Sequence, residues 1–554
     1  MTAAVTIQCP LCNDPVDKLL YRYHLDSERQ VIERIKIHNP TWTETDGACG
    51  RCVDYYHTEV VMQQRMLPEV GPYFPVKSAD DFIILPTGLR LDADQRFTGK
   101  GITICFIDSG FYLHPDLTVH RNRIKKVFDI TDESRGMDYF MQPHDASWHG
   151  TMTTVVCAGD GYASGGLYKG IASDAELLLI KVQDDQGKIT TANIRRALQW
   201  VLDNHRNYGI KIVNISLGSD EIISYKLSEI DQLAEQLIGQ GITIVCAAGN
   251  DEQGLIKAPA NAPNVIAVGG LDDENILGPN PFKLYHSTYG KTVDELMKPE
   301  LIAPAIWIAA PLLPGTGEKK EAEILYSLLK ADDREIRKNL ALHFHDTKLN
   351  ESLCGSNDVT FIRQTIIQRI QQAKYISSAY MHVDGTSFAA PIVSSIAAQL
   401  LEADPGLTPA MIRTVLFSTA KRIQQVPAER QGFGAVRARH AILKVLKRRV
   451  MSKLFLSPHV NADQNIIEFY VQNDCATQIS LSGTFNHWAQ DVLLMEPGEN
   501  GVWKIEIPML PAGRYSYKFF VDDKMWMEDV DNPFREPDGF NGFNSILIVD
   551  ENQN

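Results

Sequence analysis

Positive charge is scarce in this chain of 554 residues, in which 54 lysines and arginines face 69 aspartates and glutamates. The formal net charge of −15 repels nucleic acids and anionic membrane surfaces. Long apolar runs are also missing, because residues 301–315 are broken by three prolines. The first 20 residues have no basic segment followed by an apolar core, which predicts no secretory signal. We therefore expect a cytoplasmic protein of about two to four domains that has neither a nucleic acid nor a membrane as partner.

Cysteines are few, nine in all, but four of them form two C-x-x-C pairs: Cys9, Cys12, Cys49 and Cys52. Each pair can hold one side of a tetrahedral Zn²⁺ ion through its thiolates, so residues 1–60 are predicted to be a zinc-binding unit with a structural role. Redox pairs or disulfides are the alternatives, but neither pair lies in a visible strand–helix unit, and the cytosol does not favour disulfides. Residues 61–95 are interpreted as a linker or extension.

Short apolar runs alternate with amphipathic stretches from residue 96 onward. Four runs have the nearly continuous apolar character of buried parallel strands: residues 101–110, 175–182, 210–218 and 241–250. Between them, residues 190–206 place four apolar side chains on one face of a helix. This alternation predicts an α/β fold, in which a parallel sheet is covered by helices on both faces and ligands bind at the carboxyl ends of the strands.

Four chemically active side chains stand at the ends of these elements. Asp108 ends the first apolar run, and Asn250 ends the fourth. His149 and Ser387 each precede a stretch of small and apolar residues that is typical of a buried helix, whose first turn favours negative charge. Taken singly, such residues are usually helix caps or turn formers. Together they supply the acid, base, nucleophile and oxyanion donor that acyl transfer requires.

The motifs around these residues resemble those of the subtilases, the serine endopeptidases of the subtilisin fold. Eight motifs follow the family's order, in which Asp precedes His and His precedes Ser. They are IDSG, HGT, GIASDAELLLIKV, NISLG, AAGN, APANAPNVIAVGG, KPELIAPA and DGTSFAAP. The resemblance implies a subtilisin-like peptidase domain over residues 96–448.

The resemblance also implies a role for each residue of the site. Asp108 orients the imidazole, His149 acts as general base and then as general acid, and Ser387 attacks the carbonyl carbon. Asn250 donates a hydrogen bond to the developing oxyanion. The cleft is lined by a segment that pairs with an extended protein or peptide substrate as an added strand: Ser216, Leu217 and Gly218.

Three features depart from the family pattern. Met152, Thr153 and Thr154 follow HGT where the family commonly has a second histidine and small residues, and Phe388 replaces a usual methionine. A longer departure is an insertion at residues 312–381, just before the nucleophile, in which residues 318–344 and 361–376 are predicted helices. A lid, a regulatory contact, a dimer face and a surface elaboration all fit this insertion. No acidic loop marks a calcium site, so calcium binding stays undecided. The oligomeric state is also undecided.

The last hundred residues change character. Alternating or β-branched segments separated by glycine, proline and asparagine predict a small β-sandwich over residues 460–552. This segment resembles the glycogen-binding domain of the AMP-activated kinase β subunit. The resemblance implies that two tryptophans stack on glucose rings, that a lysine and an asparagine bond to hydroxyls, and that an apolar residue enters the glucan coil. By motif these are Trp488, Trp526, Lys518, Asn544 and Phe540.

Two hypotheses of function follow from the sequence. The first is an intracellular serine endopeptidase that is targeted or regulated by an α-glucan such as glycogen. The alternative is a catalytically silent scaffold that binds glycogen and holds peptide partners in its cleft. The first is favoured because a scaffold has no physical need for all four chemical side chains together.

Overall fold

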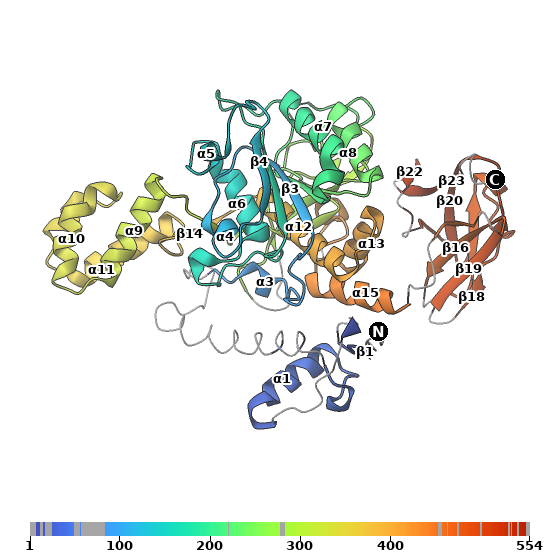
Figure 1. Ribbon diagram of the computed structural model, residues 1–554, viewed down its shortest axis with the longest axis horizontal. Coiled ribbons are helices and arrows are strands. Elements are labelled where there is room, and N and C mark those ends of the chain that lie inside the picture. Colours follow the sequence, from blue (N-terminus) through green and yellow to red (C-terminus); the bar gives the residue numbers. More distant parts are fainter. Residues whose placement is uncertain are drawn as a thin grey trace, which may run out of the picture.

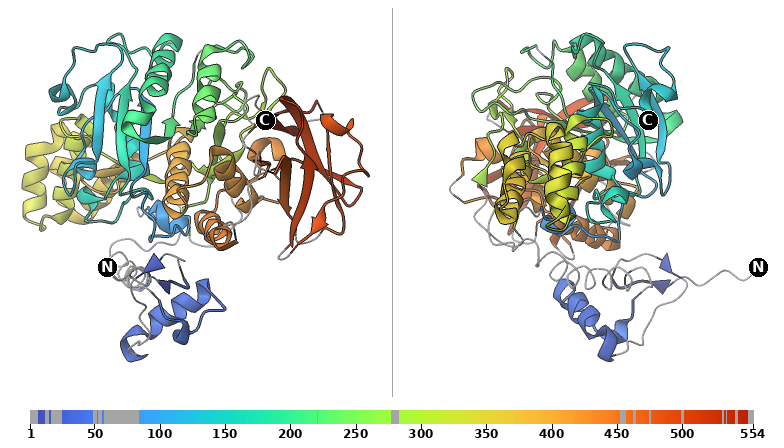
Figure 2. Two further views of the ribbon diagram at one scale, coloured as in Figure 1. Left: turned by 45° about the vertical axis from the view of Figure 1, so that its right-hand side comes forward. Right: turned by 90° about the vertical axis from the view of Figure 1, so that its left-hand side faces the viewer.

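The computed structural model consists of a central α/β domain, a helical insertion on one side, a β-sandwich on the other and a small N-terminal unit below (Figure 1). It describes residues 7–11, 15–16, 25–48, 52, 56, 84–219, 221–276, 283–424, 426–451, 457–461, 464–473, 476–498, 501–529, 532, 534–539 and 542–549. Figure 2 shows the same arrangement from two further sides. Within the described part of the chain, no helix has the length and hydropathy needed to cross a bilayer.

A twisted sheet forms the centre of the α/β domain, with the strand order β12-β8-β7-β6-β3-β5-β4. These neighbours are parallel, and β9 (Lys283–Leu284) joins β8 in the antiparallel sense. The strands are β3 (Thr103–Asp108), β4 (Ile124–Asp129), β5 (Glu176–Lys181), β6 (Ile210–Ile215), β7 (Thr243–Ala247), β8 (Ile266–Asp272) and β12 (Leu301–Pro304). The four predicted apolar runs therefore correspond to β3, β5, β6 and β7.

Helices cover both faces of this sheet, because successive apolar side chains of a buried strand point to opposite faces. In β3, Ile104 and Phe106 belong to one apolar cluster, whereas Cys105 and Ile107 belong to the other. The first cluster includes α6 (Ser147–Ala158), α12 (Thr386–Ala403), α13 (Pro409–Thr419) and α15 (Ala438–Met451). The second includes α7 (Thr191–Tyr208) and α8 (Glu229–Gly239).

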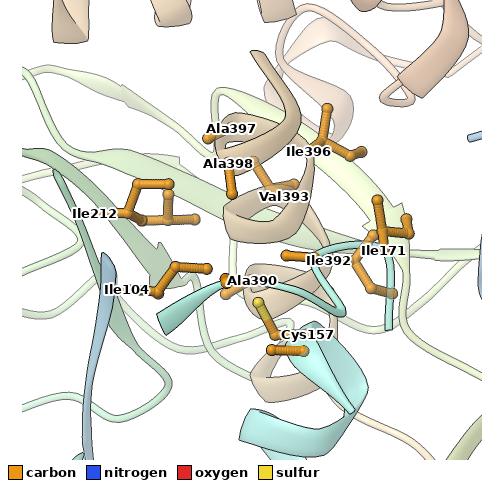
Figure 3. Close-up of a cluster of buried hydrophobic side chains, with 14 of the residues drawn as sticks. Ile104, Cys157, Ile171, Ile212, Ala390, Ile392, Val393, Ile396, Ala397 and Ala398 are labelled. Carbon is orange, nitrogen blue, oxygen red and sulfur yellow. The ribbon is translucent and has the colours of Figure 1, made fainter. Parts of the chain in front are cut away.

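The helix that carries Ser387, α12, is the most deeply buried helix of the first layer and contacts β6, β7, β8 and α6. Figure 3 shows its small side chains Ala390, Ala397 and Ala398 among the isoleucines of the core. Alanine has little side-chain volume, so the helix axis can approach the sheet closely. This packing fixes the first turn of α12 against the carboxyl ends of the strands.

The insertion folds as a separate helical cluster at the end of a hairpin of β13 (Ile308–Pro311) and β14 (Tyr380–Val383). Residues 318–344 form two helices, not the single one predicted, because the Asp332 carboxylate accepts the backbone N–H groups of Arg334 and Glu335 and starts a new helix. The helices are α9 (Gly317–Lys330), α10 (Glu335–His343) and α11 (Val359–Gln372), with short turns η3 (Phe344–Asp346) and η4 (Glu351–Gly355).

The C-terminal domain consists of two antiparallel sheets around one apolar core that includes Trp503. One sheet contains β15 (His459–Asn461), β16 (Ile466–Gln472), β19 (Val502–Pro508) and β18 (Glu496–Pro497). The other contains β17 (Ile479–Gly483), β20 (Gly513–Val521), β21 (Met525–Met527), β22 (Arg535–Pro537) and β23 (Phe543–Val549). The predicted β-sandwich is therefore present in the described residues.

The N-terminal unit contains a hairpin and a helix that lie below the central domain in every view (Figures 1 and 2). Its elements are β1 (Ile7–Gln8), β2 (Pro15–Val16), α1 (Leu25–His38) and η1 (Glu44–Asp46). The remaining short elements among the described residues are α3 (Thr87–Arg90), α4 (Pro115–Thr118), α5 (Met137–Phe140), η2 (Tyr162–Ser164), β10 (Gly290–Lys291), β11 (Met297–Lys298), α14 (Ala428–Gln431) and η5 (Thr484–Asn486).

Candidate active site

A buried carboxylate and an imidazole are hydrogen-bonded at the carboxyl end of the central strand. Asp108 is the last residue of β3, and its Oδ1 lies 2.7 Å from Nδ1 of His149 in the first turn of α6. The Asp108 side chain is only 1% exposed. Burial lowers the pKa of His149, but the charge of Asp108 and its hydrogen bond outweigh burial and hold the pKa above the ordinary value of 6.5.

Two further donors fix the carboxylate in place. The backbone N–H of Ser109 donates to Oδ1 of Asp108 at 2.7 Å, and the hydroxyl of Thr153 donates to Oδ2 at 3.1 Å. Thr153 was not identified as a site residue from the sequence, where it figured only as a departure from the family pattern. Its spacing of four residues from His149 places both side chains on one face of α6, and this spacing is the signal by which the sequence could have identified it.

Ser387 is the second residue of α12, where a backbone N–H has no acceptor within the helix. Its hydroxyl donates to the backbone oxygen of Ser216 at 3.2 Å, and the Ser216 hydroxyl donates to the backbone oxygen of Ser387 at 2.8 Å. The ring of the next residue, Phe388, lies 5.9 Å from the His149 ring. The described residues thus bring the nucleophile segment beside the imidazole, but they contain no hydrogen bond between Ser387 and His149.

Asn250 follows β7 and is held against the start of the same helix. Its Oδ1 accepts hydrogen bonds from the backbone N–H of Thr386 at 2.9 Å and from the Thr386 hydroxyl at 2.8 Å. Both bonds end on the oxygen, and among the described residues Nδ2 donates none. The side-chain amide is therefore oriented, with N–H groups available for an external acceptor.

The segment Ser216–Gly218 follows β6, which lies between β3 and β7 in the sheet. The strand order places the carboxyl ends that carry Asp108, this segment and Asn250 next to one another. Leu217 is half-buried and Gly218 is exposed. Just beyond them, the N–H of Ser219 donates to the backbone oxygen of Ala258 at 2.9 Å, which anchors the segment to the loop before β8.

A match to a protein-family model identifies the family to which this arrangement belongs. Residues 99–434, more than half of the chain, match the model of the subtilase family. The chain belongs to the subtilase family. It is thus a serine endopeptidase by class, and the predicted subtilisin-like α/β fold is confirmed. Residues 469–554 match the model of the glycogen recognition site of AMP-activated protein kinase, which supports the resemblance drawn for the C-terminal domain.

Curated relatives of this subtilase are bacterial proteases. Serine protease AprX of Bacillus subtilis (strain 168) is 28% identical over 357 residues, which cover 63% of this chain and 67% of AprX. Subtilisin Savinase of Lederbergia lenta is 28% identical over 186 residues, which cover 33% of this chain and 60% of Savinase.

Solved structures of proteases are also similar to parts of this subtilase. Sphericase has a TM-score of 0.43 at 22% sequence identity, over 61% of this chain and 92% of Sphericase. Fervidolysin from Fervidobacterium pennivorans has a TM-score of 0.44 at 20% identity, over 77% of this chain and 53% of that structure.

Four of the five predicted glucan residues of this subtilase lie among the described residues, whereas Phe540 lies outside them. The rings of Trp488 and Trp526 are 6.0 Å apart and nearly perpendicular, and Trp526 is 38% exposed. Asn544 lies in β23, and Lys518 lies in the neighbouring β20. Lys518 forms an ion pair with Asp538, a residue that no sequence pattern had marked.

Two of the four predicted zinc ligands of the subtilase are described and buried, Cys9 and Cys52, with their sulfurs 3.8 Å apart. Sulfurs at about 2.3 Å from a tetrahedral zinc ion lie about 3.8 Å from one another, so the spacing fits a shared ion. Cys12 and Cys49 lie outside the described residues, which themselves contain no group of three or more metal-ligating side chains. The guanidinium of Arg96 lies 3.7 Å from the Cys52 sulfur, where positive charge favours a thiolate.

Proposed function

We propose that this subtilase hydrolyses peptide bonds of protein substrates through Asp108, His149 and Ser387, with Asn250 as oxyanion donor. The observation that carries this proposal is the 2.7 Å contact between a buried carboxylate and an imidazole beside the first turn of α12. Asp108 accepts the Nδ1 hydrogen of His149, which leaves Nε2 as the basic nitrogen. An imidazole in this form can remove the proton of a serine hydroxyl.

In the proposed reaction, the substrate backbone pairs with residues 216–218 as an added strand. The Ser387 hydroxyl rotates from the Ser216 oxygen to Nε2 of His149, gives up its proton and attacks the carbonyl carbon. The Nδ2 group of Asn250 and the first N–H groups of α12 stabilise the oxyanion. His149 then protonates the leaving amine, and a water molecule hydrolyses the acyl-enzyme by the same sequence of proton transfers.

We further propose that the C-terminal domain binds an α-glucan such as glycogen and thereby targets or regulates the peptidase. The rings of Trp488 and the exposed Trp526 can pack on the apolar faces of glucose, while Lys518 and Asn544 can bond to hydroxyls. The family match of residues 469–554 supports this assignment. The cytoplasmic setting stays a prediction.

A silent scaffold is the second candidate, and one observation favours it: the Ser387 hydroxyl bonds to Ser216 and not to His149. The test is hydrolysis of casein by the purified protein, with and without glycogen, together with labelling by a fluorophosphonate probe. The peptidase predicts hydrolysis and labelling in at least one of the two conditions. Absence of both signals in both conditions favours the scaffold.

Removal of either predicted tryptophan ring is expected to weaken glycogen binding. Trp488→Ala and Trp526→Ala each lose a stacking surface of on the order of 2 kcal/mol, which corresponds to roughly 30-fold in affinity. Co-sedimentation with glycogen measures the change. Trp148→Ala is the matched control, because Trp148 is 50% exposed but lies in the central domain. If Trp488→Ala and Trp526→Ala both sediment with glycogen as the wild type does, the proposed glucan site is wrong.

Zinc is proposed to stabilise the N-terminal unit without taking part in catalysis, because four thiolates leave no open coordination position. We expect about one zinc ion per chain by elemental mass spectrometry, and less in Cys52→Ser. The variant is expected to unfold at a temperature several degrees lower in a thermal melt. Cys354→Ser, in the insertion, is the control that should keep both values. A wild-type protein that contains no zinc and melts at the same temperature as Cys52→Ser disproves the site.

A further inference from the structure

The β-sandwich is hydrogen-bonded directly to the peptidase domain. Arg535 of β22 donates from Nε to Oδ1 of Asn264 at 3.1 Å and from Nη2 to the backbone oxygen of Pro263 at 2.8 Å. The ring of Phe543 in β23 packs on this guanidinium at 3.6 Å. Only 10% of the Arg535 side chain is exposed. The contact therefore belongs to a buried interface between the two domains.

A second arginine, from the peptidase domain, binds the same two oxygens. Arg413 of α13 donates to Oδ1 of Asn264 at 2.8 Å and to the Pro263 oxygen at 3.4 Å. Two guanidinium groups this close repel each other unless an acid lies nearby. The Glu528 carboxylate of the sandwich lies 3.6 Å from Arg535 and supplies that negative charge. Separation of the domains would break the hydrogen bonds of Arg535 to Asn264 and Pro263, and this loss opposes movement of the sandwich.

The loop that accepts Arg535 is itself rigid. Glu235 accepts both the backbone N–H and the Nδ2 group of Asn264, each at 2.8 Å. The buried ammonium of Lys298 donates to the backbone oxygens of Ala262 and Val265 on either side. The same loop begins at Ala258, whose backbone oxygen accepts Ser219 beside the substrate segment. The sandwich is thus docked on a fixed element that also borders the cleft.

The predicted glucan residues lie on the opposite face of the docked strands. In the register of β22 and β23, Arg535 pairs with Ser545 and Glu536 pairs with Asn544. Side chains alternate between the faces of a strand, so Arg535 and Phe543 share one face, whereas Glu536 and Asn544 share the other. In the adjacent β20, Tyr517 pairs with Ser545, which places Lys518 on the face of Asn544. The exposed Trp526 pairs with Phe520, two residues after Lys518, so it lies on the same face, and this predicted glucan face is not the face through which Arg535 is docked.

We propose that Arg535 locks the glucan-binding face and the peptidase cleft into one rigid body, and that this lock selects substrates. The inference rests on the proposed function of both domains. A bound glucan is then held at a fixed distance from Ser387. Proteins attached to the same glucan are cleaved only where an extended segment is long enough to reach the cleft. Arg535 is thus a specificity-determining residue that acts at a distance from the reacting atoms.

The experiment uses substrates that carry an independent glucan-binding module, a glycine- and serine-rich linker of about 5 to about 60 residues, and a casein-derived peptide. Cleavage rates are measured on glycogen for the wild type and for Arg535→Ala. The wild type is expected to cleave the substrate with the shortest linker at least about tenfold more slowly than the one with the longest linker. Arg535→Ala, in which the sandwich can move, is expected to show less than about a twofold difference.

Three controls separate this inference from its foundation. Hydrolysis of a free peptide and sedimentation with glycogen should be the same in both proteins, and their loss in the wild type refutes the proposed function and the inference with it. Lys504→Ala, on the other sheet of the sandwich, should keep the wild-type linker profile. Arg535→Lys keeps the charge, and its linker profile should fall between those of the wild type and Arg535→Ala. It replaces Arg535→Ala in the test if that variant folds poorly. Identical linker profiles and small-angle scattering curves for the wild type and both Arg535 variants overturn the proposed lock.

Discussion

Replacement of Ser387 by alanine is expected to lower kcat for casein hydrolysis by about 10⁶-fold, the magnitude known for the nucleophile of subtilisin, a member of the same family. The reason is that the other hydroxyl of the first turn of α12, that of Thr386, is bonded to Oδ1 of Asn250 and cannot replace Ser387 as nucleophile. A residual rate of about 10³- to 10⁴-fold over water should persist from substrate binding and the oxyanion donors. Initial rates of casein hydrolysis measure the loss.

Ser352→Ala, an exposed serine of the insertion, is the matched control and should leave the rate unchanged. Thermal melts of both variants show whether the fold survives. A Ser387→Ala protein that is folded and keeps more than a tenth of the wild-type rate excludes Ser387 as nucleophile. Fluorophosphonate labelling adds an independent readout, because the probe bonds only to an activated hydroxyl and should label the wild type alone.

The sequence predicted the fold because four strands of the sheet, β3, β5, β6 and β7, lie in nearly continuous apolar runs. It also predicted which side chains gather at one edge, since Asp108, Ser216 and Asn250 all follow parallel strands. Strand ends that are neighbours in a parallel sheet meet at one edge, whatever their distance along the chain. The zinc ligands Cys9, Cys12, Cys49 and Cys52 all stay predictions, because the spacing of Cys9 and Cys52 fits a shared ion but Cys12 and Cys49 lie outside the described residues.

Other features depend on individual side-chain contacts that the apolar periodicity of the sequence does not record. Thr153 completes the partners of Asp108 from the next turn of α6, and Asp538, the residue after β22, neutralises Lys518 of β20. The contact of Arg535 with Asn264 joins residues 271 positions apart. The break between α9 and α10 arose from a single carboxylate, Asp332, that outweighed helical periodicity on both sides. The contacts of Asp538 and Arg535 depend on the tertiary arrangement, whereas the Asp332 cap is local, and periodicity encodes neither.

Asp108→Asn is expected to lower kcat by about 10⁴-fold while leaving the protein folded. The asparagine side chain keeps the size of the aspartate, but it can present an N–H to Nδ1 and so stabilise the wrong tautomer of His149. It also removes the negative charge that stabilises the imidazolium formed during attack. Asp132→Asn, an aspartate that does not contact His149, is the control and should keep the wild-type rate.

The pH dependence of the same variant tests the cause of the effect. His149 must be neutral to accept the serine proton, so kcat/KM of the wild type should rise with pH through a pKa above the ordinary value of 6.5. Burial lowers this pKa, and Asp108 raises it by its charge and its hydrogen bond. Loss of that charge leaves burial as the dominant influence, so the acidic limb of Asp108→Asn should move to lower pH. An acidic limb at the same pH in both proteins would show that Asp108 does not control the protonation of the base.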